Sequence, residues 1–247
     1  MELKNGERID DLQFKNLKII QNEEGFCFGI DAVLLSDFAK EMKKSDTVVD
    51  FCTGTGIIAI LLSGKVEKIK KIYAVEIQKE GAEMANRSVK LNKLEDKIEV
   101  LNRDLKDIDD VLKVGSVDAI TVNPPYKPIN SGIINDEDSL RIARHEICCT
   151  LEDILKQSSK LLKFGGSFYM VHRPERLVDI MFYMRKYKIE PKRIRFVHPN
   201  ENAASNLVLV EGTRGGKPFL KFEKPLYVYD KSGKYTDEIL KIYNLKE

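Results

Sequence analysis

The four residues Asn123-Pro124-Pro125-Tyr126 follow an apolar run, Val117 to Val122, that is typical of a buried strand. Because proline has no backbone N–H, two consecutive prolines end any sheet ladder at this point. The residue before a proline is held extended, so Asn123 is expected at the end of the strand. The motif therefore presents an amide and an aromatic ring at a sheet edge. A rigid strand-ending turn with no chemical role is the alternative.

An amide in this position could activate an amine. The side-chain oxygen of Asn123 and the carbonyl of Pro124 can each accept one hydrogen from an NH2 group. An aryl amine or amide held in this way has its lone pair localised and aimed at an electrophile. Tyr126 could stack on a planar substrate, a contact worth roughly 1–3 kcal/mol for a base. Catalysis would then be mostly positioning, without a strong general base.

A second group of residues could bind a nucleoside. The apolar run Thr47–Phe51 continues into Cys52-Thr53-Gly54-Thr55-Gly56, and a helical pattern follows. Glycines allow a tight turn and the close approach of a ligand, and ligands of open parallel sheets bind beyond the strand ends. The next apolar run ends in Glu76, whose carboxylate could accept both hydroxyl hydrogens of a ribose. Asp104 follows the third run and could accept from an adenine amine.

A dinucleotide site is the main rival for this loop. Its fingerprint is G-x-G-x-x-G, and Ala59 stands in the third position here, which the fingerprint tolerates. Asp50 beside the loop would repel a pyrophosphate but suits a cationic amine. This favours S-adenosylmethionine, which carries an ammonium and a sulfonium. An ordinary strand–glycine–helix turn without a ligand is the third interpretation.

The elements that must position these residues alternate along the chain. Apolar runs predict strands at residues 47–51, 71–77, 97–101, 117–122, 167–172, 193–198 and 206–212. Helical patterns occupy residues 56–64, 78–92, 107–113, 147–163 and 174–188. This alternation predicts an α/β fold with a mostly parallel sheet and helices on both faces. The fourth strand then lies across the switch point from the first, which brings Asn123 toward the glycine loop.

The first 44 residues have a different pattern. The stretch Phe14–Gly29 predicts a hairpin turned at Asn22 to Gly25, and a helix is expected from Ala32 to Met42. We interpret residues 1–44 as an extension packed on a core of residues 45–247, the two forming one structural unit.

Composition limits the class of protein. A chain of 247 residues with 43% hydrophobic residues can bury a core without disulfides. The four cysteines, Cys27, Cys52, Cys148 and Cys149, have no C-x-x-C spacing, which suits neither a disulfide framework nor a zinc site, and HEICC is not a zinc motif. We expect no metal. No run approaches ~18 apolar residues, and the N-terminus lacks the pattern of a signal peptide. We therefore expect a soluble, cytoplasmic protein with no membrane partner.

Positive charge is concentrated late in the chain. Eight Lys or Arg and three acids lie between His172 and Asn200, although the formal net charge of the protein is only +2. Such a cluster could contact phosphates, or it could be a solvated helix face. The candidate RNA-binding residues are Arg173, Arg176, Arg185, Lys186, Lys192, Arg193 and Arg195. The polar stretch Lys127 to Arg144 is either a lid over the target nucleotide or a disordered loop.

Taken in order, DFCTGTG, the acid Glu76, NRD and NPPY resemble the amino-methylating class I S-adenosylmethionine-dependent methyltransferases. The segments GFCFGIDAVLLSDFA, ARHE and VHRPERL are similar to the bacterial tRNA(Val) adenine methyltransferase group. The resemblance covers nearly the whole chain. It implies a Rossmann-like, seven-stranded sheet with one antiparallel late strand, and methylation of the 6-amino group of an adenine next to the anticodon. The implied cofactor is S-adenosylmethionine, and the implied partner is tRNA.

The resemblance also assigns residues to two roles. Those expected at the cofactor are Asp50, Thr53, Gly54, Gly56, Glu76, Ile77, Asp104 and Asn123. Those expected at the target amine are Asn123, Pro124, Pro125 and Tyr126.

Other substrates share the chemistry of this motif. Enzymes that methylate a glutamine amide of translation release factors usually carry a helical N-terminal domain, and only residues 1–44 precede the core here. Enzymes acting on a guanine amine of ribosomal RNA usually have Phe where Tyr126 stands. DNA adenine enzymes usually carry a target-recognition domain, for which this chain has no room. A non-catalytic cofactor-binding subunit and a dehydrogenase are the alternatives from other classes. The sequence leaves the oligomeric state open.

Overall fold

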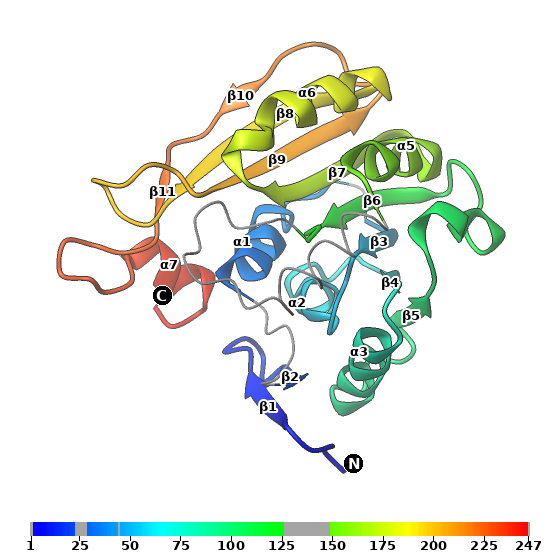
Figure 1. Ribbon diagram of the computed structural model, residues 1–247, viewed down its shortest axis with the longest axis vertical. Helices are drawn as coiled ribbons and strands as arrows, with labels where there is room; N and C mark the ends of the chain where they lie inside the picture. Colours follow the sequence, from blue (N-terminus) through cyan, green and yellow to red (C-terminus); the bar gives the residue numbers. More distant parts are fainter. Residues whose placement is uncertain (1, 23–28, 44, 126–148, 247) are drawn as a thin grey trace, which may run out of the picture.

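The centre of the molecule is one mixed β-sheet (Figure 1). The computed structural model describes residues 2–22, 29–43, 45–125 and 149–246. In these ranges the sheet has nine strands, with β11 paired to β8 and the others in the order β10-β8-β9-β7-β6-β3-β4-β5. The bounds of these strands are β3 Thr47–Phe51, β4 Lys71–Glu76, β5 Ile98–Asn102, β6 Val117–Val122, β7 Leu162–His172, β8 Ile189–His198, β9 Leu207–Arg214, β10 Lys221–Phe222 and β11 Leu226–Tyr227. All seven predicted strands are present, and β10 and β11 are two-residue additions.

The strand directions confirm the predicted fold class. Strands β5, β4, β3, β6 and β7 run parallel, and β9 is antiparallel to both β7 and β8. The chain order reverses between β3 and β6, which lie side by side with Phe51 opposite Val122. The glycine loop and Asn123 therefore leave neighbouring strands at the same sheet edge, where ligands of such sheets bind.

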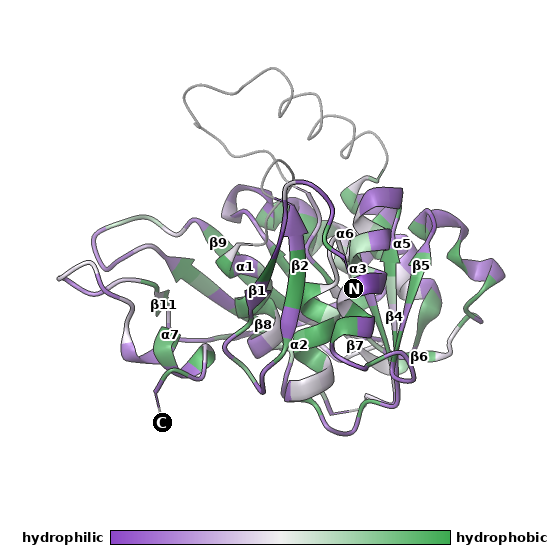
Figure 2. Cartoon of the chain, turned by 90° about the horizontal axis from the view of Figure 1, so that it is seen from below, coloured by the Kyte–Doolittle hydropathy of each residue, from purple (hydrophilic) through white to green (hydrophobic). Residues whose placement is uncertain are grey.

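Helices cover both faces of the sheet. Their bounds are α1 Ile30–Phe38, α2 Ile57–Lys65, α3 Lys79–Leu91, α5 Leu151–Leu161, α6 Leu177–Lys186 and α7 Asp237–Ile242, with the 3-10 helices η1 Leu105–Asp110 and η2 Pro174–Arg176. Neighbouring strand residues point to opposite faces, so Val48 packs with α1 and α2 while Val49 packs with α5 and η1. The central strands are therefore apolar on both sides, and strands of the sheet are largely green, for hydrophobic residues, in Figure 2.

The N-terminal extension contains a hairpin that the sequence did not predict. Strand β1 (Glu7–Asp11) pairs with β2 (Lys18–Asn22), and Leu12 N–H donates to Leu17 O in the turn between them. The sequence Glu7–Asp11 is polar and mostly exposed, so it lacks the apolar alternation that reveals a strand. Residues 23–28, which complete the predicted turn and second strand, lie outside the described residues.

Contacts with the core hold the extension in place. Strand β2 packs on α3, where Ile20 N–H donates to Ser88 Oγ at 3.0 Å and Lys18 N–H donates to Asn92 Oδ1 at 2.8 Å. Helix α1 packs on α2 and on the sheet, and the Phe38 ring meets Tyr169 of β7 edge-on. Helix α1 is thereby fixed next to the sheet edge where the chain reverses.

Three predicted elements differ in detail. The helix expected at 107–113 is the 3-10 helix η1, and the helix expected from Pro174 starts as η2 before α6. Gly165 and Gly166 lie inside β7 rather than before it, because α5 ends at Leu161 and the strand begins at once. A side chain at Gly166 would come within 3.0 Å of Asp118 O, so this glycine lets two strands approach. In the described part of the chain, no helix is long and apolar enough to span a membrane.

Candidate active site

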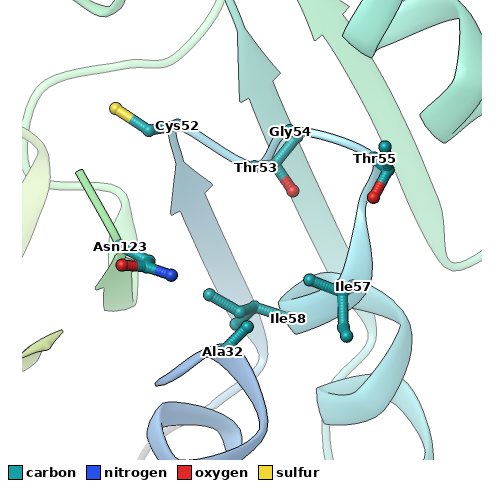
Figure 3. Close-up of a pocket in the computed structure, with 8 residues that line it drawn as sticks. All are labelled: Ala32, Cys52, Thr53, Gly54, Thr55, Ile57, Ile58 and Asn123. Carbon is teal, nitrogen blue, oxygen red and sulfur yellow. The ribbon is translucent and has the colours of Figure 1, made fainter. Parts of the chain in front are cut away.

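Asn123 and the glycine loop, one member from each group of chemically suggestive residues, line one small pocket at the carboxyl edge of the sheet (Figure 3). Its lining residues are Ala32, Cys52, Thr53, Gly54, Thr55, Ile57, Ile58 and Asn123. The loop after β3 forms one wall, and Asn123 at the end of β6 lies across from the start of α2. Ala32 of α1 belongs to the N-terminal extension, which the sequence analysis did not place at the site.

The loop after β3 has an unusual backbone. Cys52, Gly54 and Gly56 all have positive φ angles, of 56°, 57° and 91°. Gly56 caps the N-terminus of α2, and a Cβ there would lie 3.3 Å from Ala85 Cβ. A Cβ on Gly54 would meet nothing within 4 Å, so this glycine faces open space that a ligand can fill. Cys52 holds a left-handed conformation that non-glycine residues seldom adopt.

Asp50, at the end of β3, is hydrogen-bonded to the loop that follows it. Its side chain is fully buried, with Oδ2 accepting from Thr53 Oγ1 at 2.5 Å and Oδ1 accepting from Thr121 Oγ1 at 2.6 Å. Burial raises the pKa of this carboxyl to about 7, although the two hydroxyl donors lower it and Glu76 raises it further. The carboxyl group connects the loop to β6 through Thr121, a residue that no sequence motif marks. A direct contact between Asp50 and a cofactor amine stays a prediction.

Glu76 is held in place by backbone donors. Gly54 N–H donates to Oε2 and Gln78 N–H donates to Oε1, both at 2.8 Å. Each carboxylate oxygen has a further lone pair, so the group can still accept two hydroxyl hydrogens. Asn102 Nδ2 donates to the carbonyl oxygens of Glu76 and Ile77 and fixes the strand end. The Ile77 side chain, 42% exposed, offers an apolar surface beside the acid.

Asp104 lies at the same edge, beyond β5, and caps η1. Its Oδ1 accepts from Lys106 N–H at 2.9 Å, and its Oδ2 lies 3.2 Å from Lys106 Nζ. The ammonium of Lys106 therefore occupies one oxygen that an adenine amine would use. The adenine contact of Asp104 stays a prediction.

Asn123 has a fixed partner within the protein. Its Nδ2 donates to Asp31 Oδ2 at 3.1 Å, and Asp31 lies in the first turn of α1. With Nδ2 so used, Oδ1 remains as the acceptor that an amine needs. Pro124 is buried and Pro125 is half-buried. Tyr126 and the stretch Lys127 to Arg144 lie outside the described residues, so their roles stay predictions.

The late cations do not form one patch. Strands β7 and β8 point the same way, because each is antiparallel to β9. Helix α6 therefore returns from the site edge to the opposite edge, roughly 15 Å over its ten residues. Arg173 and Arg176 precede it at the site edge, whereas Arg185 and Lys186 end it on the far side.

Acids from other elements balance most of this positive charge. Arg176 pairs with Asp179, Lys186 with Glu152, and Arg195 with Glu238. Lys192 Nζ donates to Lys217 O, and Arg185 lies 3.5 Å from Glu190. The RNA-binding role of these residues stays a prediction.

Arg193 is a special case within the set. Its side chain is only 15% exposed, and its three nitrogen atoms donate to Glu211, Glu223 and the carbonyl of Phe38. The guanidinium also lies 4.0 Å from the centre of the Phe38 ring. Arg193 therefore joins β8, β9 and α1, a structural role that the local charge count could not reveal.

Comparison with known proteins decides the family. The family model of the methyltransferase small domain matches residues 16–184, which is more than half of the chain. The chain belongs to this family. The match includes the glycine loop, Glu76 and Asn123, so the methyltransferase expected from the motifs is confirmed.

Curated relatives of this methyltransferase agree with that assignment. A protein of Porphyromonas gingivalis named tRNA1(Val) (adenine(37)-N6)-methyltransferase is 25% identical over 94% of this chain and 93% of its own length. A protein of the same name from Bacteroides thetaiotaomicron is 31% identical over 64% of this chain and 65% of its own length.

Solved structures share the fold of this methyltransferase. A predicted O-methyltransferase from Agrobacterium tumefaciens has a TM-score of 0.68 at 22% identity and covers 87% of this chain and 95% of its own. The tRNA m1G37 methyltransferase of M. jannaschii has a TM-score of 0.60 at 18% identity, over 87% of this chain and 56% of its own. Both comparisons confirm the class I Rossmann-like fold.

Proposed function

We propose that this protein transfers a methyl group from S-adenosylmethionine to the 6-amino group of an adenine in tRNA. The observation that carries the proposal is the placement of Asn123 beside the glycine loop in one pocket. The names of the curated relatives support the adenine and the tRNA. A cytoplasmic location follows from the same substrate.

The residues at the sheet edge fit the methyl donor. Gly54 leaves open space at the loop, which suits the methionyl part. Glu76 has lone pairs for the ribose hydroxyls, and Ile77 offers an apolar surface for the adenine ring. Asp104 lies at the same edge for the adenine amine. The bound donor supplies a methyl group on a positively charged sulfur.

The protein's own part in the reaction is to hold and aim the target amine. Asn123 Oδ1 and the Pro124 carbonyl accept its two hydrogens, which localises the nitrogen lone pair. Tyr126 stacks on the target base in this proposal. Because the donor is a strong electrophile, alignment supplies most of the rate enhancement, and no general base is required before transfer. The nitrogen loses its proton after alkylation, when it has become acidic.

The target base must leave its stack to reach this pocket. Extrusion is easiest in a single-stranded loop, which favours an anticodon loop over a duplex. Arg173 and Arg176 lie at the site edge and are the best-placed candidates for nearby phosphates. Arg185 and Lys186 could contact only a more distant part of the RNA. Substitution of Arg176 by Gln should therefore weaken RNA binding more than the same change at Arg185.

The test is nucleoside mass spectrometry. The purified protein is incubated with S-adenosylmethionine and unmodified tRNA transcripts, which are then digested. We expect 6-methyladenosine with the wild type but not with Asn123→Ala. The control is Asn5→Ala, at an exposed residue near the N-terminus, which should also give 6-methyladenosine. Binding of S-adenosylhomocysteine is measured for each variant.

If no methylated nucleoside forms although S-adenosylhomocysteine binds, the tRNA substrate is wrong. A release-factor glutamine and a ribosomal guanine would then be tested, because their amide and amine need the same alignment by Asn123. Binding of NAD without S-adenosylhomocysteine would contradict the cofactor as well.

A further inference from the structure

The side chain of Asn123 is oriented by a residue that no motif assigns to catalysis. Asp31 in the first turn of α1 accepts from Asn123 Nδ2 at 3.1 Å through Oδ2. Its other oxygen, Oδ1, accepts from Ala32 N–H at 2.9 Å. Both carboxylate oxygens are thereby engaged, and the acid cannot turn away from Asn123 without losing contacts.

Gly29 gives independent evidence that the place of this carboxylate matters. Its φ of −97° and ψ of 179° are open to every residue, so the backbone does not require glycine here. A Cβ at Gly29, however, would lie 2.7 Å from Asp31 Oδ1. Glycine at this position leaves room for the carboxylate. Ala32, the next residue after Asp31, lines the same pocket as Asn123.

The chemistry of the amide explains why such a partner is needed. An asparagine amide has an accepting end and a donating end of nearly equal size. If the amide turned over, Nδ2 would face the target amine, and two donors would oppose each other. An ionised carboxylate only accepts, so it selects the orientation in which Nδ2 points to Asp31. A charged partner also strengthens the hydrogen bond and polarises the amide, which makes Oδ1 a better acceptor.

We propose that Asp31 is a positioning residue for the methyl transfer, which fixes the Asn123 amide with Oδ1 toward the target amine. The inference rests on the proposed function, but it requires only an amine or amide substrate and not a particular RNA. It gives the N-terminal extension a part in the reaction. The competing explanation is that Asp31 only stabilises α1, since an acid in the first turn of a helix is favourable.

The test uses graded substitutions at Asp31. Asp31→Ala removes the acceptor, and Asp31→Asn keeps one carbonyl oxygen, which can serve Asn123 Nδ2 or Ala32 N–H but not both. Asp237→Ala, which removes a first-turn acid from α7, is the matched control for a helix-stabilising role. Single-turnover methyl-transfer rates, S-adenosylhomocysteine affinity and melting temperature are measured for each.

We expect Asp31→Ala to slow methyl transfer roughly 30- to 100-fold, the effect of a misplaced group at a site that works by alignment. Asp31→Asn should recover part of this loss. The affinity for S-adenosylhomocysteine should stay within about threefold of wild type in both, because Asp31 acts on the amine side. A rate for Asp31→Ala equal to that of Asp237→Ala overturns the inference. The inference is also overturned if the slower methyl transfer of Asp31→Ala is accompanied by a large loss of S-adenosylhomocysteine affinity and by a large drop in melting temperature.

A double-mutant cycle distinguishes the positioning role of Asp31 from a purely structural role, because only the positioning role depends on Asn123. If Asp31 acts through Asn123, then Asp31→Ala should cost no more than about threefold in an Asn123→Ala background, where there is no amide to orient. A radiolabelled methyl donor makes the slow rates measurable. An equal loss in both backgrounds overturns the inference.

The two proposals fail in different ways. A wild type that methylates no adenine but methylates another amine contradicts only the proposed substrate, and the Asp31 series is then run on that amine. A wild type that binds S-adenosylhomocysteine but methylates no amine or amide contradicts both. An active wild type with an unaffected Asp31→Ala contradicts only the inference.

Discussion

Asp50→Asn isolates the energetic effect of a buried acid beneath the glycine loop. Asp50 is fully buried, and its two partners are the hydroxyls of Thr53 and Thr121. Because burial penalises the charged form, the pKa of the carboxyl rises from 3.8 to about 7. Asn has nearly the same shape but cannot ionise, and a threonine hydroxyl can turn to accept from its NH2 group.

The size of the effect follows from linkage. The pKa is higher in the folded state, so between about pH 4 and pH 7 the folded protein binds more protons than the unfolded chain. Stability from this group is therefore present at low pH and falls as the pH rises through that window. The shift of about 3 pH units corresponds to about 4 kcal/mol in total, of which about 2.5 kcal/mol is lost between pH 5 and pH 8.

The assay is urea unfolding of both proteins at several pH values between 5 and 8. We expect the free energy of unfolding of Asp50→Asn, relative to wild type, to rise by about 2.5 kcal/mol over this range. Asp46→Asn is the control, since Lys70 lowers the pKa of that exposed acid below 3.8, so its curve should run parallel to that of wild type between pH 5 and pH 8. Parallel curves for wild type and Asp50→Asn would contradict a raised pKa, because Asp50 would then have the same pKa in the folded and the unfolded state.

Three further predictions concern single side chains. Glu76→Gln should weaken S-adenosylhomocysteine binding roughly 10- to 100-fold by calorimetry, because its NH2 group must face the N–H of Gly54 or Gln78, whereas Glu80→Gln should leave binding unchanged. Cys52→Val should destabilise the fold by about 2 kcal/mol, since a β-branched residue fits poorly at φ 56°, while Cys52→Gly should stay within about 1 kcal/mol. Arg193→Met should lower the free energy of unfolding by about 3 kcal/mol, because it leaves Glu211 and Glu223 without their buried partner. Arg185→Met, at an exposed pair, should change it by under about 1 kcal/mol, and equal losses at the two arginines would contradict the structural role of Arg193.

The elements of the core could be predicted because their signals are local. Apolar strands such as Val117–Val122 are buried on both faces, and the glycine loop and the double proline mark where two of them end. Strand β1 could not be recognised, because a polar strand that is exposed on a small hairpin has no apolar alternation. The broken start of α6 depends on how Pro174 meets its neighbours, which the pattern does not contain.

The partners of the candidate site could not be predicted because they are distant in sequence. Thr121 meets Asp50 across 71 residues, and Asp31 meets Asn123 across 92. Asp31 lies in a segment that supported the family resemblance, yet its neighbours in the sequence gave no chemical reason to connect it with Asn123. The cations around α6 form one cluster in the sequence, but the length of the helix separates them in space, and acids on several helices and strands pair with them.

The role of Asn123 is tested by the single-turnover rate of Asn123→Ala on tRNA, measured together with the affinity of this variant for S-adenosylhomocysteine. If Asn123 aligns the target amine, the rate should fall at least about 100-fold while the affinity stays within about threefold of wild type and of Asn5→Ala. If this variant still methylates adenine at the wild-type rate, Asn123 does not align the target amine.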